Sequence, residues 1–254
     1  MVLEKPAWCT LSPSSDFARD FESTKSYALH EGGIMTDVTG KSSKSRMGFY
    51  SSDMENSGSD RSPSRALKTA CAVLAECTII AAVNKVEFFE KALESPARAI
   101  YLLTGNPLNL PDMLERARQH SKVCLINIDF LDGLARDRYA VEFLAAHHVD
   151  GLVSTRIEVL KAAHDLDLIT VQRTFAIDSA AITTTLKSLN QFVPDAMEVL
   201  PAMVAPKVAR RLHASFPHLA IIGGGLIEGV REIEELLGAG VRSVSVSDPR
   251  LWLV

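Results

Sequence analysis

The sequence predicts an α/β protein with a TIM-like (β/α)8 barrel, in which parallel strands alternate with helices and close into a cylinder. Eight short apolar runs recur between residues 78 and 247, and an amphipathic helical segment separates each run from the next. Strands that alternate with helical patterns form parallel sheets, and a set of eight favours closure into a barrel. A doubly wound open sheet is the alternative.

The predicted strands are rich in Val, Ile, Leu and Ala, and most are bounded by Gly, Pro, Asp or Asn. Such short apolar runs are typical of strands that are buried on both faces, as in a parallel sheet. In chain order they cover residues 78–83, 99–105, 123–129, 150–155, 168–173, 196–201, 220–225 and 243–247.

The predicted helices show apolar residues that recur every three or four positions. One helix precedes the first strand, and seven others follow strands one to seven. They cover residues 65–76, 85–95, 111–121, 137–148, 157–167, 179–192, 206–216 and 231–240. Only residues 248–254 follow the eighth strand, so the eighth helix of the regular fold is missing. We expect the helix at 65–76 to replace it by packing between strands eight and one.

Residues 1–64 have a different composition. Fourteen serines lie between Ser12 and Ser64, mixed with glycines and charged residues and without a sustained apolar period. Such a segment buries too little apolar surface to offset the entropy of ordering it. We therefore predict a disordered Ser-rich extension at 1–64, followed by one barrel domain at 65–254. A transit peptide is an alternative that the acidic residues oppose, and a translation start at Met35, Met47 or Met54 is another.

Charge and hydropathy restrict the class of function. The formal net charge is −4, and residues 71–254 hold 22 acidic against 18 basic residues. A mildly acidic domain gives little support to nucleic-acid binding, which usually leaves a basic footprint. No apolar run approaches the roughly 18 residues of a membrane span, and the N-terminus lacks the pattern of a secretory signal.

The four cysteines are Cys9, Cys71, Cys77 and Cys124, and their spacing fits no metal motif. Without an export signal they are most simply reduced thiols. We therefore expect a cytoplasmic protein without a membrane partner.

Polar residues gather where the predicted strands end. In this fold the carboxyl ends of all strands meet at one mouth, which carries the function. The residues at these ends are Thr104, Gly105, Asn106, Asn127, Asp129, Ser154, Thr155, Arg156, Gln172, Arg173, Glu198, Pro201, Gly223, Gly224, Gly225, Ser245 and Ser247. We therefore expect a binding site at this mouth.

Residues 221–227, IIGGGLI, end the seventh strand on three glycines that lead into a helix. The loops after strands seven and eight of many such barrels bind phosphate through backbone N–H groups and a helix N-terminus. Gly224 and Gly225, together with Ser245 and Ser247 of the eighth strand, therefore predict a site for phosphate or another anion. The alternative is that the glycines only allow tight packing of strand against helix.

Charged and amide side chains at the other strand ends are candidate ligand contacts. Arg156 and Arg173, with Gln172 beside the second arginine, fit an oxyanion or a backbone phosphate. The alternative is that these arginines snorkel outward on the surface. Asp129 and Glu198 fit an acid/base pair, acceptors for ligand hydroxyls, or partners of the arginines.

Other kinds of chemistry leave no signature. No histidine lies in a predicted strand, and no HExxH, GxSxG or GxxxxGK[ST] motif occurs. We therefore expect no catalytic nucleophile, no metal site and no cofactor. Lys207, at the start of the helix after strand six, either reaches the mouth or simply begins its helix.

The chain from Cys77 to Trp252 resembles the glycerol-3-phosphate-responsive antiterminators, also called glycerol uptake operon antiterminator regulatory proteins. In order, the matching stretches are TIIAAVNKVEFFEKALES, IYLLTGNPLNL, INIDFLDGLARDRYAVEFLA, DGLVSTR, TVQRTFAIDS, DAMEVLPAMVAPKV, GGGLI and SVSDPRLW. The resemblance implies a TIM-barrel-like fold and the sensing of glycerol-3-phosphate. It also implies binding to leader mRNA, which prevents termination of transcription at glycerol genes.

The resemblance also implies a set of site residues. By position, the family's characteristic residues correspond to Asp129, Ser154, Thr155, Arg156, Gln172, Arg173, Asp178, Ser179, Glu198, Pro206, Lys207, Gly224, Gly225, Ser245 and Ser247. The glycines and serines would take the phosphate of glycerol-3-phosphate, and Asp129 and Glu198 would accept from its hydroxyls. Asn127 stands where the family usually has His, and Ala202 where it usually has Gly. Residues 1–64 have no counterpart.

Two other functions are alternatives. A phosphate-binding barrel enzyme of the isomerase, aldolase or lyase class would use Asp129 and Glu198 as base and acid. A metabolite-binding barrel would regulate through a protein partner, without turnover and without RNA. For RNA, the stretch PKVARRLH with Lys207, Arg210 and Arg211 is the candidate surface, and a solvated helix face is its alternative. The C-terminal LWLV is a candidate for burial between the subunits of a homo-oligomer.

Overall fold

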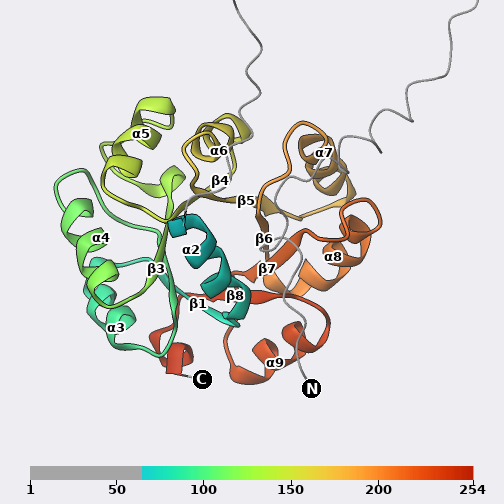
Figure 1. The fold of residues 1–254 in the computed structure, drawn as a ribbon. Coiled ribbons are helices and arrows are strands. Elements are labelled where there is room, and N and C mark those ends of the chain that lie inside the picture. Colours follow the sequence, from blue (N-terminus) through green and yellow to red (C-terminus); the bar gives the residue numbers. More distant parts are fainter. Residues whose placement is uncertain (1–64, 254) are drawn as a thin grey trace, which may run out of the picture. The chain divides into compact units, whose positions relative to one another are not determined.

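The structure is a computed structural model that describes residues 65–253, and eight parallel strands form a closed barrel within them. Neighbouring strands in the sequence pair in parallel, and β8 pairs with β1. Helices surround the strands (Figure 1). The predicted (β/α)8 barrel is therefore confirmed, and the open sheet is wrong. The predicted disorder of residues 1–64 falls outside the described residues.

The strands and helices follow the predicted order closely. The strands are β1 (Ile79–Val83), β2 (Ala99–Leu102), β3 (Val123–Asn127), β4 (Gly151–Ser154), β5 (Ile169–Phe175), β6 (Ala196–Leu200), β7 (Ala220–Gly224) and β8 (Ser243–Val246). The α-helices are α2 (Arg65–Glu76), α3 (Phe89–Glu94), α4 (Leu110–Gln119), α5 (Arg138–Ala146), α6 (Ile157–His164), α7 (Ser179–Leu189), α8 (Ala205–His213) and α9 (Val230–Gly238). Short 3-10 helices are η2 (Val86–Phe88), η3 (Ile128–Phe130), η4 (Ala202–Val204) and η5 (Pro249–Leu253). In the described part of the chain, no helix is long and apolar enough to cross a membrane.

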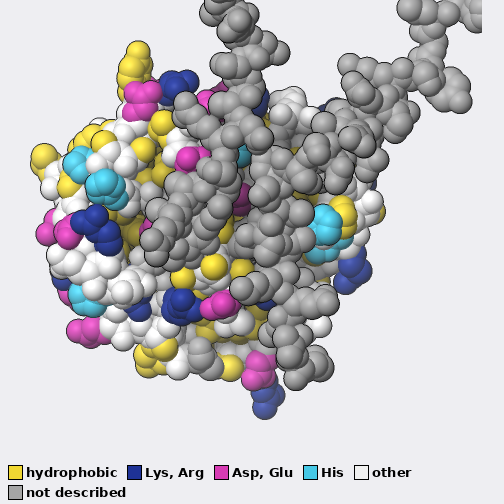
Figure 2. Space-filling view, viewed as in Figure 1, with side chains coloured by type: hydrophobic (Ala, Val, Ile, Leu, Met, Phe, Trp, Pro, Cys, Tyr) yellow, Lys and Arg dark blue, Asp and Glu magenta, His cyan; other side chains and the backbone are white. Residues whose placement is uncertain are grey.

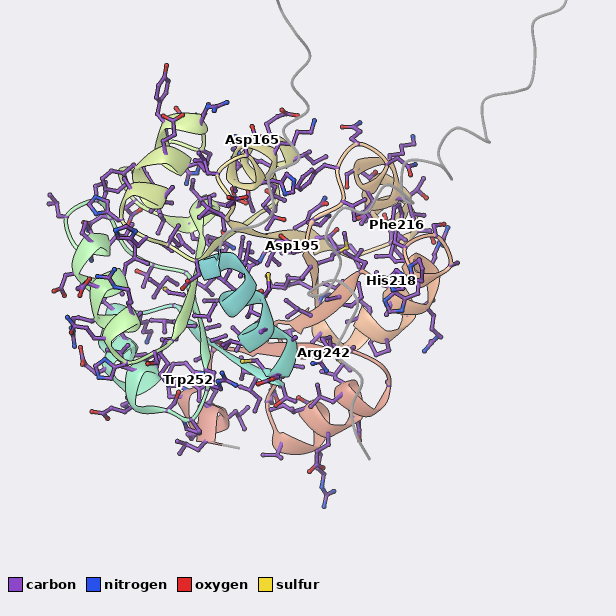
Figure 3. The ribbon with its side chains drawn as sticks, viewed as in Figure 1. Asp165, Asp195, Phe216, His218, Arg242 and Trp252 are labelled. Carbon is purple, nitrogen blue, oxygen red and sulfur yellow. The ribbon has the colours of Figure 1, made fainter. Side chains whose placement is uncertain are left out.

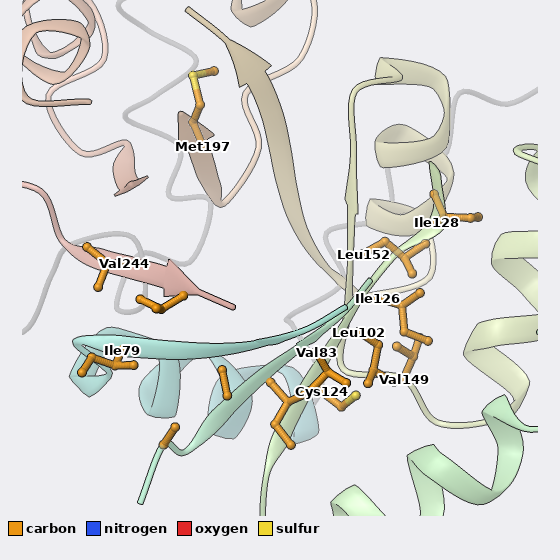
Figure 4. Close-up of a cluster of buried hydrophobic side chains, with 14 of the residues drawn as sticks. Ile79, Val83, Leu102, Cys124, Ile126, Ile128, Val149, Leu152, Met197 and Val244 are labelled. Atoms are coloured by element: carbon orange, nitrogen blue, oxygen red, sulfur yellow. The ribbon is translucent and has the colours of Figure 1, made fainter. Parts of the chain in front are cut away.

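Side chains alternate between the outer face and the lumen along each strand. Outward-facing residues such as Val83, Leu102 and Ile126 pack in one large core cluster, part of which Figure 4 shows. Lumen-facing residues such as Leu125 and Val171 form a second cluster. Because both faces of each strand are buried, the strands read as nearly continuous apolar runs in the sequence.

Helix α2 does not lie between β8 and β1, so that prediction is wrong. Its Leu74 packs with lumen-facing residues, including Val171 and Ile222, and the helix contacts β3 and β5. Figure 1 views the barrel from the end that α2 covers. This amino-terminal end of the lumen is lined by apolar side chains, which would otherwise face water. The apolar side of α2 covers them and leaves the opposite mouth as the open end.

The gap between β8 and β1 is filled instead by η5, which contacts both strands and α3. Trp252 is 1% exposed, and its indole Nε1 donates to the backbone oxygen of Val246 at 2.7 Å. Leu251 is also buried. Leu251 and Trp252 therefore pack against their own barrel, whereas Leu253 is 71% exposed, and burial of this segment between subunits stays a prediction.

We predict that Leu74→Ala lowers the free energy of unfolding by about 2–5 kcal/mol, because it leaves a cavity under the amino-terminal end of the lumen. Chemical denaturation followed by Trp252 fluorescence measures the change. Ala72→Ser, at an exposed position of the same helix, is the matched control and should change stability by about 0.5 kcal/mol or less. Equal stability of the two variants would show that α2 does not seal the barrel.

Candidate functional site

The lumen becomes polar toward the carboxyl ends of the strands. The register places one side chain from each even-numbered strand in a layer, and one from each odd-numbered strand in the next layer toward the mouth, as is usual in this fold. These layers are Tyr101, Val153, Glu198 and Ser245, and then Ala82, Asn127, Arg173 and Gly224. Five of the residues that the sequence places at strand ends, Asn127, Arg173, Glu198, Gly224 and Ser245, are thus brought together inside the barrel.

Arg173 and Glu198 form an ion pair inside the lumen. Arg173 Nε donates to Glu198 Oε2 at 2.5 Å, and Ser245 Oγ donates to Glu198 Oε1, also at 2.5 Å. The side chain of Glu198 is 0% exposed and that of Arg173 is 6% exposed. Burying two charges is costly, and loss of one partner of such a pair destabilises a protein by about 3–5 kcal/mol. The first role of these residues is therefore to satisfy each other.

The glycines after β7 meet two separate demands. A Cβ on Gly224 would lie 2.7 Å from both Glu198 Oε1 and Ser245 Oγ, so only glycine leaves room for this pair. Gly225 has φ +75° and Leu226 has φ +58°, which turns the chain away from the strand through the left-handed region. Tight packing thus accounts for Gly224, and phosphate binding in this loop stays a proposal.

Two polar atoms in the same layers have no hydrogen-bond partner: the hydroxyl of Tyr101 and the amide Nδ2 of Asn127. Both residues are 0% exposed. Leaving a buried donor unsatisfied costs about 1–3 kcal/mol, and such groups are rare in native proteins. Tyr101 is not among the site residues predicted from the sequence. Its signal is the alternation along residues 99–103, which points Tyr101 into the lumen with Ala99.

The Tyr101 phenol is electrostatically coupled to the ion pair. Burial raises its pKa well above the usual value near 10, the charge of Glu198 raises it further, and Arg173 lowers it by a smaller amount. The phenol therefore stays protonated and keeps an O–H that can donate.

Asp129 organises the rim of the mouth between β3 and β4. Its Oδ1 accepts from Ser154 Oγ at 3.0 Å, and its Oδ2 accepts from the backbone N–H of Thr155 at 2.7 Å and from Thr155 Oγ1 at 2.9 Å. Arg156 Nε lies 3.9 Å from Asp129 Oδ1, and the Arg156 side chain is 61% exposed. Asp129 therefore holds the loop after β4, and Arg156 extends from this loop into solvent.

Phe130 connects this rim to the lumen. It ends η3, directly after Asp129, and its ring lies 5.2 Å from the guanidinium carbon of Arg173. The side chain is 50% exposed. A ring over a guanidinium is a favourable cation–π contact, so Phe130 covers Arg173 on the side toward the mouth.

Two helix N-termini near β7 and β8 already hold carboxylates of this chain. Glu232 accepts from the backbone N–H of Glu228 at 2.7 Å ahead of α9, and Asp248 accepts from the backbone N–H of Arg250 at 2.9 Å in η5. Helix α8 has no side-chain N-cap and no acidic residue in its first turn, where Lys207 is exposed. A cation is unfavourable at that end of a helix. Charge therefore favours an anion there, but η4 runs directly into α8, the backbone N–H of Ala205 donates to the backbone oxygen of Ala202, and Pro206 has no N–H.

Gln172 and Ser247 differ from the other predicted site residues. Gln172 lies on the outward side of β5 and donates through Nε2 to Ser188 Oγ of α7 at 2.8 Å, so the structure does not bring it to the mouth. Strand alternation explains this, because Arg173 is the residue that points inward. Ser247 follows β8 and is exposed, which leaves its hydroxyl available at the rim.

The two carboxylates, Asp129 and Glu198, are engaged by different parts of the chain. Both oxygens of Glu198 and both oxygens of Asp129 accept hydrogen bonds from separate sets of partners. The buried Cys77 and Cys124 thiols have raised pKa values because burial disfavours the thiolate, so neither is an activated nucleophile. Among residues 65–253, no group of three or more His, Cys, Asp or Glu side chains is arranged to hold a metal ion.

Comparison with known proteins identifies relatives along the whole barrel. The family model described as "Glycerol-3-phosphate responsive antiterminator" matches residues 79–252. A glycerol uptake operon antiterminator-related protein of Thermotoga maritima is 29% identical, with a TM-score of 0.64, over 70% of this chain and 99% of that chain. A glycerol uptake operon antiterminator regulatory protein of Listeria monocytogenes is 29% identical, with a TM-score of 0.65, over 70% and 95% of the two chains.

Among curated proteins, the uncharacterised protein YgcP of Escherichia coli K12 is 27% identical over 181 residues, which are 71% of this chain and 94% of that protein. Because the family model covers well over half of the sequence, the chain belongs to the glycerol-3-phosphate responsive antiterminator family. The resemblance drawn from the sequence is confirmed.

We predict that Gly224→Ala destabilises the protein by about 1–3 kcal/mol, because its Cβ would crowd the hydrogen bond between Ser245 and Glu198. Gly238→Ala is the matched control. A Cβ there meets nothing within 4 Å, and Gly238 belongs to α9 without a positive φ. Alanine has the higher helix propensity, so this variant should be neutral or slightly more stable. Differential scanning calorimetry of both variants tests the claim, which is refuted if Gly224→Ala melts with the wild type.

The raised pKa of Tyr101 predicts a loss of stability at alkaline pH. The phenol ionises near pH 10 in the unfolded chain but only at higher pH in the folded barrel, so the unfolded state releases this proton first. Below pH 10 the proton is bound in both states and the phenol adds no pH dependence, and above pH 10 the stability of the wild type declines. Denaturation midpoints from pH 8 to 11 should fall less steeply for Tyr101→Phe than for the wild type. Parallel curves would mean that the phenol titrates normally.

Proposed function

We propose that this chain is a glycerol-3-phosphate-responsive transcription antiterminator, which acts in the cytoplasm on the leader mRNA of glycerol genes. Membership of the family supports the class of function. The observation that carries the proposal is the polar mouth, where exposed cationic side chains lie above a buried layer with unpartnered donors. A small ligand with an anionic end and a hydroxyl end matches this division.

In this proposal the phosphate lies over β6 to β8. Lys207 would supply the charge, the Gly225 turn would supply backbone N–H groups, and Ser247 would supply a hydroxyl. Arg156 lies across the mouth beside Asp129, where it is placed to contact either the ligand or RNA. The hydrogen-bonded network of Glu198, Arg173 and Ser245 lies deeper in the lumen than the phosphate. It would hold the inner surface of the site in place.

The proposed RNA contact is the exposed side of α8. Lys207, Arg210 and Arg211 are exposed there and form no ion pair with another described residue. On the face drawn in Figure 2, the Lys and Arg side chains are scattered among Asp and Glu side chains. RNA can be held by a local basic surface, by shape and by stacking, so a net charge of −4 is compatible with one such surface. Effector control requires that glycerol-3-phosphate bind the RNA-competent state more tightly than the other state.

The enzyme alternative has no such support. An acid/base pair needs carboxylates that are free to exchange protons with a ligand. In the barrel, Glu198 is ion-paired with Arg173 and bonded to Ser245, and Asp129 holds a loop. We therefore propose a sensor and not an isomerase, aldolase or lyase.

We predict that the full chain binds glycerol-3-phosphate with a Kd near 1 μM, about −8 kcal/mol, and binds leader RNA more tightly when the effector is present. Isothermal titration calorimetry measures the first step, and filter binding of a glycerol-gene leader transcript measures the second. Removing charge from the α8 surface with Arg210→Gln and Arg211→Gln should weaken RNA binding and reduce its dependence on salt.

The control for that pair is Arg98→Gln, which removes one positive charge beside Glu76 at the start of β2, on the other side of the barrel from α8, and should leave RNA binding unchanged. Glycerol and inorganic phosphate alone should bind much more weakly than glycerol-3-phosphate. If RNA affinity is the same with and without the effector, the antiterminator proposal fails.

A further inference from the structure

The unpartnered donors in the lumen point to a ligand of definite chemistry. The Tyr101 hydroxyl and the Asn127 amide Nδ2 are fully buried and bond to no other described residue. They come from neighbouring strands, β2 and β3. The register puts Tyr101 in the layer of Glu198 and Asn127 in the layer of Arg173. The four polar groups therefore face one short length of lumen.

The same two layers contain small residues. Ala82 and Gly224 stand in the layer of Asn127 and Arg173, where the regular packing of this fold is dominated by bulky branched side chains. Gly224 is kept small by Glu198 and Ser245, but neither of these residues bonds to Tyr101 or Asn127. These two layers of the lumen thus contain two free donors, on Tyr101 and Asn127, one anionic acceptor, Glu198, and few large apolar side chains.

The cover of this region is a short turn. The backbone N–H of Asp129 donates to Asn127 Oδ1 at 3.1 Å, which fixes the amide so that Nδ2 is the group left without a partner. The next residue in the turn is Phe130, whose half-exposed ring lies over Arg173. One turn, η3, therefore both orients a donor in the lumen and covers the lumen toward the mouth.

We infer that the lumen beneath Phe130 is a subsite for the hydroxyl groups of a polyol phosphate, with Tyr101 and Asn127 as donors and Glu198 as acceptor. A hydroxyl both donates and accepts, so it satisfies the carboxylate and the amide together. The phosphate stays at the rim. The inference rests on the proposed function for the identity of the ligand, glycerol-3-phosphate, and it assigns Tyr101 and Asn127 as the residues that recognise the glycerol end.

The test compares ligands with and without hydroxyls on the full chain. Calorimetry would measure the Kd of glycerol-3-phosphate, of propyl phosphate and of inorganic phosphate for the wild type, Tyr101→Phe and Tyr139→Phe. Tyr139 is 80% exposed, so Tyr139→Phe removes a hydroxyl outside the site. A site built to bind a hydroxyl rejects the analogue that lacks it, often by large factors. We expect Tyr101→Phe to raise the Kd of glycerol-3-phosphate about tenfold or more and to leave the Kd of propyl phosphate unchanged. Tyr139→Phe should bind both compounds with the wild-type Kd.

The melting temperature separates recognition from a structural role. Because the Tyr101 hydroxyl has no partner in the free protein, Tyr101→Phe should melt at the wild-type temperature or above it. A second variant, Asn127→Asp, keeps the oxygen that accepts from the backbone N–H of Asp129 and replaces the Nδ2 donor with a second oxygen. It should also weaken the binding of glycerol-3-phosphate.

Each result decides between the subsite and the proposed effector. Equal affinity of glycerol-3-phosphate for the wild type and Tyr101→Phe would overturn the subsite, and buried water would then be the partner of the phenol. The sensor proposal would stand. If glycerol-3-phosphate fails to bind but another polyol phosphate of three to six carbons binds in a Tyr101-dependent way, the subsite stands and the proposed effector fails. If none of these compounds binds, both are overturned.

Discussion

The ion pair between Arg173 and Glu198 is the constraint on which the upper half of the barrel depends. A carboxylate with no solvent exposure must be paired and hydrogen-bonded, and Arg173 and Ser245 supply its partners. The pair in turn requires glycine at position 224, and the charge of Glu198 adds to the effect of burial, which is the larger cause of the raised pKa of Tyr101. It also places a guanidinium under Phe130. One buried charge thus fixes residues from several strands.

The two ends of the barrel have different physical tasks. At the amino-terminal end the lumen is apolar, and α2 covers it with Leu74. Arg242 lies at this end beside α2, and Trp252 lies in η5 (Figure 3). At the other end, polar layers and the rim around Asp129 form the mouth. Because the amino-terminal end is sealed by the chain itself, a ligand that reaches the polar layers enters through the mouth.

The sequence was sufficient for the alternation of strands and helices and for the residues at the strand ends, because both follow from local periodicity. It was not sufficient for the position of α2, because an apolar helix face packs equally well on a barrel side or across its end. Gln172 and Arg173 are adjacent, and only the strand's phase, set by the whole barrel, decides which one points inward. Tyr101 lies within β2 and not after its last residue. The sequence argument selected only residues at or after the strand ends, so it did not include Tyr101.

The most direct measurement is a crystal structure of the full chain with bound glycerol-3-phosphate. We expect electron density for the glycerol hydroxyls beneath a displaced Phe130, within hydrogen-bonding distance of Tyr101 and Asn127. The phosphate should lie near Lys207 and the Gly225 turn. Density confined to the outer rim, with Phe130 still over Arg173, would contradict the account, because the buried polar layers would then take no part in recognising the ligand.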